Sequence, residues 1–210
     1  KKICERGAEY LGCSPDDVEF DGEKVVNLKT KEEITRKEIG NKVMCSSNAP
    51  LSATEAFSSP VSPPPFMVGI AEVEIDKETG VVEPIDYAAV VDCGTVVNPN
   101  LARVQTEGGI AQGIGMALYE DIIYSEKGKN YSNSFMQYKI PSRLDVGEIR
   151  VEFESSYEPT GPFGAKSIGE IVINTPSPAI SNAVQNAVGV IVRELPITAE
   201  KVYKGMAEKE

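Results

Sequence analysis

The chain has 210 residues, enough for one large domain or two small ones, and 41% of them are hydrophobic, as in a soluble globular protein. Its net charge of −11 disfavours nucleic acid as a partner, and no apolar run approaches the length of about 18 residues that a membrane span requires. The four cysteines are widely spaced and there is no histidine. Ser–His and Cys–His pairs within this chain are thereby excluded, and we expect reduced thiols in a cytoplasmic protein. Cys93 follows a strand with no base partner nearby in sequence, which favours a buried structural thiol.

Residues 1–44 predict a small N-terminal piece that combines helices with a hairpin. Apolar side chains recur at helical spacing over residues 2–11, and a glycine follows as a stop. The Asp21-Gly22 pair predicts a hairpin turn. A Thr-x-x-Glu capping box that begins at Thr35 predicts a second helix.

Residues 45–65 carry five prolines and no hydrophobic period, so they predict a linker. We expect a larger C-terminal domain, residues 66–210, after it. Its first elements are two strands, 66–76 and 81–94, which are joined by a short turn that ends in glycine. Asn98 and Pro99 then provide an N-cap and a first-turn proline for a helix of roughly 100–119.

Further along the chain we expect a hairpin at 121–135, a half-buried strand at 148–156 and a second long helix. Ser177 is the expected cap of that helix and Pro178 its first-turn proline. Because strands and helices do not alternate regularly, the order predicts an α+β fold, with helices packed on a mixed or antiparallel sheet. The expected buried stripe of the second helix is Ile180, Ala183, Val184, Ala187, Val188 and Ile191.

Residues 161–170, GPFGAKSIGE, form a glycine-rich loop with one lysine and a terminal carboxylate. A phosphate-binding P-loop is excluded, because Thr160 and Ala165 stand where that motif needs glycines. Two interpretations remain open. The glycines could serve only to turn a strand into a helix, or the loop could present Glu170 for chemistry.

The predicted helix carries QTEGGIAQGIG at residues 105–115. Each glycine there lowers helix stability by roughly 1 kcal/mol relative to alanine. Such a cost is expected only where some group must approach the helix backbone closely. Gln105 and Gln112 are two turns apart and share a face, with Gly108 and Gly109 between them. This pattern suits a flat polar ligand. Tight helix–helix packing with glutamines at its rim is the alternative. A dinucleotide fingerprint is excluded, because its last glycine is replaced by leucine.

Five stretches occur in a characteristic order: GIAEVEIDKETGVV, VVDCGTVVNPNLARVQTEGGIAQGIGMALYED, YKIPSRLD, GPFGAKSIGE and LPITAEKV. Together they closely resemble the C-terminal part of the molybdopterin-binding subunit of the xanthine dehydrogenase / aldehyde oxidase family. The resemblance covers nearly the whole chain and is strongest from Phe66 to Val202. Each motif alone is moderately specific, whereas five in order are highly specific.

The resemblance implies a molybdenum hydroxylase that oxidises a carbon of an aldehyde or an electron-poor N-heterocycle, with water as the oxygen source. In that family the glutamate of the last glycine motif, Glu170 here, is the catalytic base. The molybdenum is held by the sulfurs of the pterin and not by side chains, so no metal ligand is expected in this chain. The loop sequence resembles purine dehydrogenases, which favours a purine substrate. Lys166 could lie beside the substrate or the pterin tail, or it could be a solvated loop lysine. The residues expected at the cofactor are Gln105, Gln112, Gly108, Gly109, Lys166 and Ser167.

The resemblance also implies partners. Iron–sulfur clusters and FAD are expected on other domains or subunits, and the remainder of the molybdopterin subunit is expected to complete the site, because residues 1–65 match none of its earlier cofactor elements. We therefore expect a fragment or split-gene product that is inactive alone. An aldehyde or nicotinate hydroxylase, or a non-catalytic half-subunit, are the alternatives. The family usually has proline shortly after the glutamate, and Ile171 here predicts a less constrained backbone.

Overall fold

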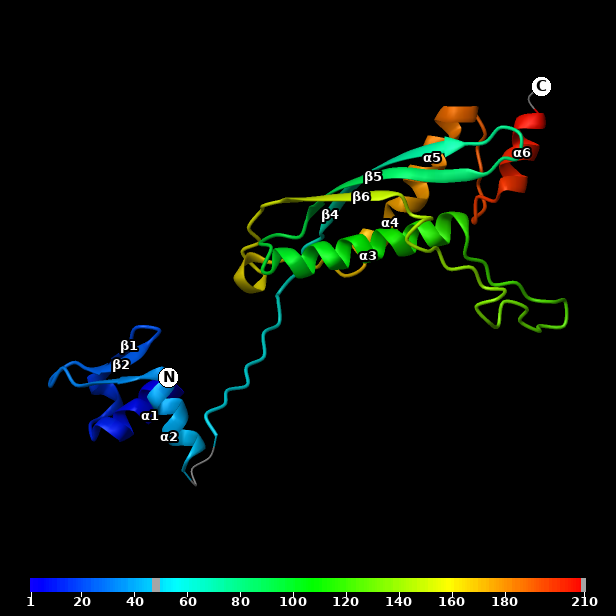
Figure 1. The fold of residues 1–210 in the computed structure, drawn as a ribbon. Coiled ribbons are helices and arrows are strands. Elements are labelled where there is room, and N and C mark those ends of the chain that lie inside the picture. The colour runs from blue at the N-terminus through cyan, green and yellow to red at the C-terminus, as the bar shows by residue number, and fades with distance from the viewer. Residues whose placement is uncertain (47–49, 209–210) are drawn as a thin grey trace. The chain divides into compact units, whose positions relative to one another are not determined.

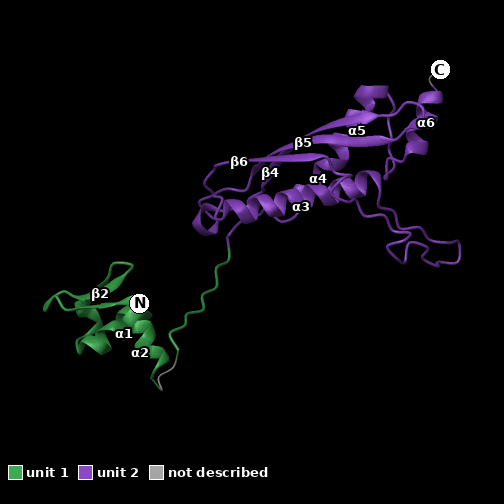
Figure 2. Ribbon diagram, viewed as in Figure 1, with its two compact units in different colours: residues 1–58 green, residues 59–210 purple. Residues whose placement is uncertain are grey.

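The computed structural model describes residues 1–46 and 50–208, so part of the predicted linker, 47–49, and the last two residues lie outside the described range. Two compact units are present, Lys1–Ser58 and Ser59–Glu210 (Figure 2). The division between them falls inside the segment for which the sequence predicts a linker.

The N-terminal unit has the predicted helices and hairpin. The Thr35 hydroxyl accepts a hydrogen bond from the Glu38 amide while the Glu38 carboxylate accepts from the Thr35 amide, which confirms the capping box. A third strand, absent from the sequence-based expectation, pairs antiparallel with the second. Leu51 packs against the core of this unit, so the first part of the predicted linker belongs to it. The elements are α1 (Lys2–Leu11), η1 (Pro15–Asp17), β1 (Val18–Phe20), β2 (Lys24–Asn27), β3 (Glu33–Thr35) and α2 (Arg36–Met44).

The C-terminal unit is built on a three-stranded sheet with the order β4-β5-β6 (Figure 1). The first two strands are antiparallel and the third runs parallel to the second, which confirms the predicted mixed sheet. No helix among the described residues is long and apolar enough to cross a membrane. The elements are β4 (Phe66–Ile75), β5 (Val82–Asp92), α3 (Pro99–Leu118), β6 (Glu148–Glu154), η2 (Pro162–Gly164), α4 (Ile171–Asn174), α5 (Pro176–Val188) and α6 (Ala199–Ala207).

Helices cover one face of this sheet, and the hydrophobic core of the unit lies between the sheet and these helices. Burial alternates along β4 and β5, as expected for a sheet packed on one side. Tyr87 and Val151 on the sheet join Ile110 and Ile114 of α3 and Ile180 of α5 in a single buried cluster. This packing fixes α3 as a rigid support, and the loops at its N-terminal end are held against it.

The hairpin predicted at 121–135 is wrong as a pair of strands. Only an isolated bridge between Tyr124 and Asn130 forms in this described stretch, which extends from the end of α3 as an irregular loop (Figure 1). Phe135 and Met136, at its end, are exposed. A two-stranded hairpin without a packing partner is marginal, because it buries too little apolar surface.

The second long helix begins earlier than predicted. It starts at Pro176, whose fixed φ suits the first helical turn, and Ser177 lies inside it and does not cap it. The preceding Thr175 makes no capping bond, since its hydroxyl accepts from Tyr87 instead. Gly189 ends the helix in the left-handed region, so Ile191 lies beyond it and is exposed. Ala187, also predicted to be buried, is exposed as well.

Candidate functional site

The glycine-rich segment 161–170 is attached to the end of β5 by backbone hydrogen bonds. Gly94 and Ala165 form an antiparallel bridge. The Lys166 amide donates to the Cys93 carbonyl at 2.7 Å, and the Thr95 amide donates to the Gly164 carbonyl at 2.8 Å. Gly94 has a φ of +69°, and a Cβ there would lie 2.3 Å from the Gly164 oxygen, so only glycine fits.

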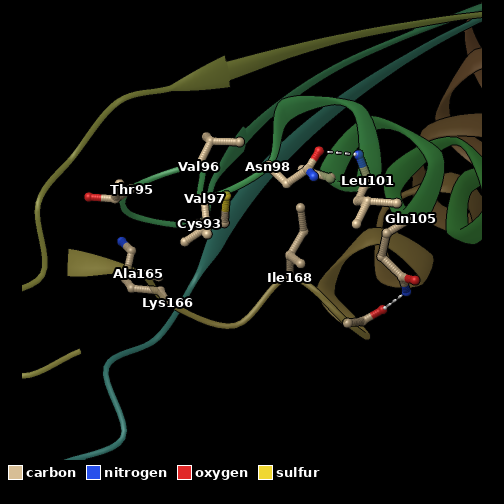
Figure 3. Close-up of a pocket in the computed structure, with 12 residues that line it drawn as sticks. Cys93, Thr95, Val96, Val97, Asn98, Leu101, Gln105, Ala165, Lys166 and Ile168 are labelled. Atoms are coloured by element: carbon tan, nitrogen blue, oxygen red, sulfur yellow. Dashed lines mark hydrogen bonds between the residues drawn. The ribbon is translucent and has the colours of Figure 1, made fainter. Parts of the chain in front are cut away.

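The two sequence motifs singled out above meet in space. The side-chain amide of Gln105 donates a hydrogen bond to the Gly169 carbonyl at 2.9 Å (Figure 3). Beside this bond lies a pocket of about 320 Å³ between α3 and the start of α4, which we call the glutamine pocket. Its lining includes Gln105, Gly108, Gly109, Gln112, Gly169 and Glu170. Five of the seven predicted site residues are therefore brought together.

The helix glycines divide into two kinds. A Cβ at Gly109 would lie 2.1 Å from Val172 Cγ2, and one at Gly113 would lie 2.6 Å from Pro176 Cγ. These glycines permit close packing of α3 against α4 and α5, so the packing alternative holds for both. Around Gly108, by contrast, no atom comes within 4 Å of an added Cβ.

Gly108 consequently exposes bare helix backbone to the glutamine pocket, and no packing contact within the described residues explains why this position is a glycine. It is exposed, as are Gln105 and Gln112 on either side of it. A helix surface without a side chain, flanked by neutral hydrogen-bonding amides, fits a flat polar group such as a pterin. Gln105 and Gln112 would supply hydrogen bonds to that group, and Gly108 would let it approach the helix.

Glu170 is exposed and immediately precedes α4, a single turn in which Val172 has no exposed surface. After Glu170 the chain is held by Val172, which packs into the space left by Gly109, and the expectation of a less constrained backbone stays a prediction. The Glu170 side chain makes no capping hydrogen bond, and the backbone fixes only where its Cα lies.

Lys166 is not the solvated lysine that the sequence allowed. Its side chain is 8% exposed, and Nζ lies 2.5 Å from Asp92 Oδ2 and 5.3 Å from the centre of the Phe66 ring. Asp92 also accepts from the Ser156 hydroxyl at 2.6 Å and the Gly94 amide at 3.0 Å. The bond from Lys166, with those from Ser156 and Gly94, lowers the pKa of Asp92 to about 2.

A second pocket, of about 450 Å³, lies on the other side of the Gln105–Gly169 bond (Figure 3). Val97, Leu101 and Ile168 make most of it apolar, and we call it the apolar pocket. Cys93 borders it but is only 4% exposed, and burial raises the pKa of its thiol. This confirms the buried thiol predicted from the sequence.

Ser167 and Glu158 lie outside both pockets. Ser167 is exposed, and it is not among the described residues that line either pocket. Glu158, the carboxylate nearest to Glu170 in sequence, accepts from the hydroxyl and amide of Thr160, which lowers its pKa. An enzyme that worked with carboxylates alone would need a second carboxylate near Glu170 with a raised pKa, and the lowered pKa of Glu158 is the opposite of what a general acid needs.

Sequence reasoning missed Asp92 and Val172. Asp92 stands at the end of a strand, where a charged residue is ordinary, and only its contact with Lys166 marks it. Val172 could have been suspected, because a bulky apolar residue directly after an exposed glycine-rich segment needs a place to pack. Within the described residues, no group of three or more His, Cys, Asp or Glu side chains is placed to bind a metal.

Comparison with known proteins gives a consistent result. The family model described as "Molybdopterin cofactor-binding domain" matches residues 1–147. The protein named "Probable hypoxanthine oxidase XdhD" of Escherichia coli (strain K12) is 34% identical over 98% of this chain and 22% of its own length. The aldehyde oxidoreductase molybdenum-binding subunit PaoC of the same strain is 29% identical over 96% of this chain and 27% of its own.

Among solved structures, quinoline 2-oxidoreductase from Pseudomonas putida 86 superposes with a TM-score of 0.77 at 27% identity, over 99% of this chain and 28% of that one. This chain thus spans about a quarter of the length of these relatives. The match extends over both units and confirms the predicted fold. The chain belongs to the molybdopterin cofactor-binding domain family of the molybdenum hydroxylases related to xanthine dehydrogenase and aldehyde oxidase.

Proposed function

We propose that this chain forms part of the molybdenum-cofactor subunit of a xanthine dehydrogenase-like enzyme, which hydroxylates a purine or related N-heterocycle with water as the oxygen source. The observation that carries the proposal is the convergence of Gln105, Gly108, Gln112 and Glu170 on one pocket. The names of two relatives, a hypoxanthine oxidase and a quinoline oxidoreductase, support an N-heterocycle. The name of PaoC supports an aldehyde as the alternative substrate.

Each residue has a proposed role. Molybdenum-molybdopterin, when bound, supplies the redox chemistry that removes two electrons from the substrate. Glu170 acts as the general base that accepts the proton released as the new carbon–oxygen bond forms. Gln105 and Gln112 hydrogen-bond the cofactor, and Gly108 permits its close approach to α3. Ser167 remains a proposed cofactor contact, because its hydroxyl is exposed on the segment that carries Glu170.

We further propose that the chain is inactive alone and works with the remainder of the subunit and with iron–sulfur and FAD components. Glu170 and the two glutamines are exposed here, whereas catalytic groups of this kind work in sites from which water is excluded. A cytoplasmic location fits the four free thiols found in the described residues, since reducing compartments keep cysteines unpaired.

The test is the substitution Glu170→Gln in the complete enzyme that contains this chain. Bound molybdenum and xanthine oxidation are measured for the native protein and the variant. We expect metal content to persist while kcat falls by at least about 10³-fold, because general-base catalysis and positioning are lost together. Glu154→Gln, at an exposed position at the end of β6, is the matched control and should turn over normally. Unchanged turnover of Glu170→Gln would contradict the proposed role.

A further inference from the structure

Asp92 is placed at the junction of three segments. It is the last residue of β5, and its carboxylate accepts hydrogen bonds from Lys166 Nζ, the Ser156 hydroxyl and the Gly94 amide. These donors belong to the glycine-rich segment, to the stretch after β6 and to the turn that follows β5. The carboxylate therefore joins all three segments through charge-assisted or directional bonds.

Lys166 borders the apolar pocket, but its charge is already paired in this arrangement. Its side chain is 8% exposed, its ammonium group contacts Asp92, and it also lies over the Phe66 ring at the start of β4. A lysine that is buried and paired in this way acts as a fixed point of the chain. Its own amide is bonded to the Cys93 carbonyl, so backbone and side chain are both held at the end of β5.

The segment that leads to Glu170 is thus attached at two points. Lys166 is held by β5, and the Gly169 carbonyl is held by Gln105 on α3. Lys166 and Glu170 are four residues apart, a distance of at most about 14 Å in an extended chain. These two attachments set where the Glu170 backbone lies, and with it the region that the uncapped carboxylate can reach.

We propose that Asp92 and Lys166 form a positioning pair, which sets the location of the Glu170 carboxylate without contacting the substrate. This rests on the proposed role of Glu170 as the base. An ion pair of this kind adds little stability compared with well-packed apolar side chains at the same positions. What the protein gains from the pair is therefore the fixed position of the two residues. A catalytic base displaced by about 1 Å can lose roughly 10²-fold in rate.

The proposal differs from a direct role of Lys166 as a ligand for an anionic group of the cofactor. If the lysine bound such a group directly, Asp92→Asn would free its charge and metal content would not fall. Only Lys166→Met would then lose metal. A positioning pair gives another pattern, because removal of either partner frees the same segment and the two substitutions are not additive.

The experiment uses the complete enzyme with Asp92→Asn, Lys166→Met and the double substitution. Amide hydrogen exchange is measured for peptides that cover 161–170, together with molybdenum content, kcat and KM. We expect exchange in this segment to accelerate by about tenfold in each variant, because the opening free energy of the loop falls. We expect kcat to fall by about 10–100-fold with KM and molybdenum content nearly unchanged. The double variant should be no worse than either single one.

The pair of Asp86 and Arg150 also links β5 to another segment, but its cation is 61% exposed, so it provides the matched control. Asp86→Asn and Arg150→Met should leave exchange at 161–170 and kcat as in the native enzyme. Lys166→Arg preserves the charge and should retain most activity. This variant also tests the pair if Lys166→Met fails to fold.

Two results would overturn the proposal: unchanged exchange and kcat in Asp92→Asn, or loss of metal in Lys166→Met while Asp92→Asn keeps both metal and turnover. The exchange measurement does not use turnover. A failure of the proposed function, seen as normal activity of Glu170→Gln, is therefore distinguishable from a failure of the pair to hold the segment.

Discussion

The side-chain amide of Gln105 donates a hydrogen bond to the backbone carbonyl of Gly169, 2.9 Å away and sixty-four residues later in the chain. This bond connects the glycine-bearing face of α3 with the residue that precedes Glu170. Of the two polar atoms of the glutamine side chain only Nε2 carries hydrogens, so Nε2 is the atom directed at the Gly169 carbonyl. The Oε1 atom of Gln105 is then left for another partner.

Replacing Gln105 should therefore disturb two features together. For Gln105→Leu we expect the affinity for the molybdenum cofactor to fall by about 10–100-fold, as for residues that orient a metal site, and the molybdenum content to fall with it. We also expect hydrogen exchange of the Gly169 and Glu170 amides to accelerate. Metal analysis and hydrogen exchange on the complete enzyme measure both. Gln185→Leu, at an exposed position on α5, is the matched control. Normal metal content in Gln105→Leu would contradict a cofactor role for this residue.

The neighbouring glycines Gly108 and Gly109 give opposite predictions for the same change. Gly108→Ala meets no atom within 4 Å, so it should raise the free energy of unfolding by about 0.5–1 kcal/mol through helix propensity. In the complete enzyme it should nonetheless lower cofactor content, because the methyl group occupies the open side of the glutamine pocket.

Gly109→Ala places a methyl group 2.1 Å from Val172 Cγ2 and should cost about 1–3 kcal/mol of unfolding free energy. Urea unfolding of both alanine variants, read beside their molybdenum content, tests the division of the helix glycines. If Gly108→Ala were to keep full cofactor content, Gly108 would have no part in binding it.

The pKa of Asp92 predicts how stability depends on acid. Its pKa is lowered from 3.8 to about 2, so its contribution to stability is fully present above about pH 4 and is lost as pH falls toward 2. The difference in unfolding free energy between the native protein and Asp92→Asn should be constant above pH 4 and shrink below it. A difference that does not change between pH 5 and pH 2.5 would show that the carboxylate is not stabilised in the folded state.

The buried hydroxyl of Tyr87 ties the sheet to the helices. It donates to Thr175 Oγ1 at 2.8 Å, and the tyrosine is only 1% exposed. Tyr87→Phe should therefore cost about 1 kcal/mol of unfolding free energy. Tyr203→Phe, at a half-exposed position on α6, should be nearly neutral and is the control.

The same hydroxyl explains why Gly69 must be a glycine. A Cβ at that position would lie 1.9 Å from the Tyr87 hydroxyl oxygen. We expect Gly69→Ala to destabilise the native protein by about 1–3 kcal/mol, and to cost less in the Tyr87→Phe background, where the oxygen is gone. Equal costs in both backgrounds would mean that the clash is relieved elsewhere.

Several elements follow from local sequence alone. Gly12 ends α1, Thr35 and Glu38 cap α2, and Asn98 with Pro99 begins α3, because caps and first-turn prolines act on neighbouring backbone groups. Hydrophobic alternation likewise predicts β4, β5 and β6. The motif order also identifies the family, and the spacing of the helix glycines and glutamines indicates which face of α3 carries the site.

Other features depend on contacts between distant segments. Thr175 precedes α5 without capping it because its hydroxyl accepts from Tyr87, and the side chains of 121–135 are mostly exposed, so that stretch lacks the packing that would stabilise a hairpin. Local patterns cannot reveal either feature.

The site shows the same division between sequence and tertiary structure. The sequence determined which residues are available for catalysis and cofactor binding. The fold decided that Gly109 packs against Val172 while Gly108 stays open, and that the Lys166 ammonium contacts Asp92 and not solvent. The physical reason is that packing and ion pairing depend on distances in space, which residue spacing along the chain does not specify.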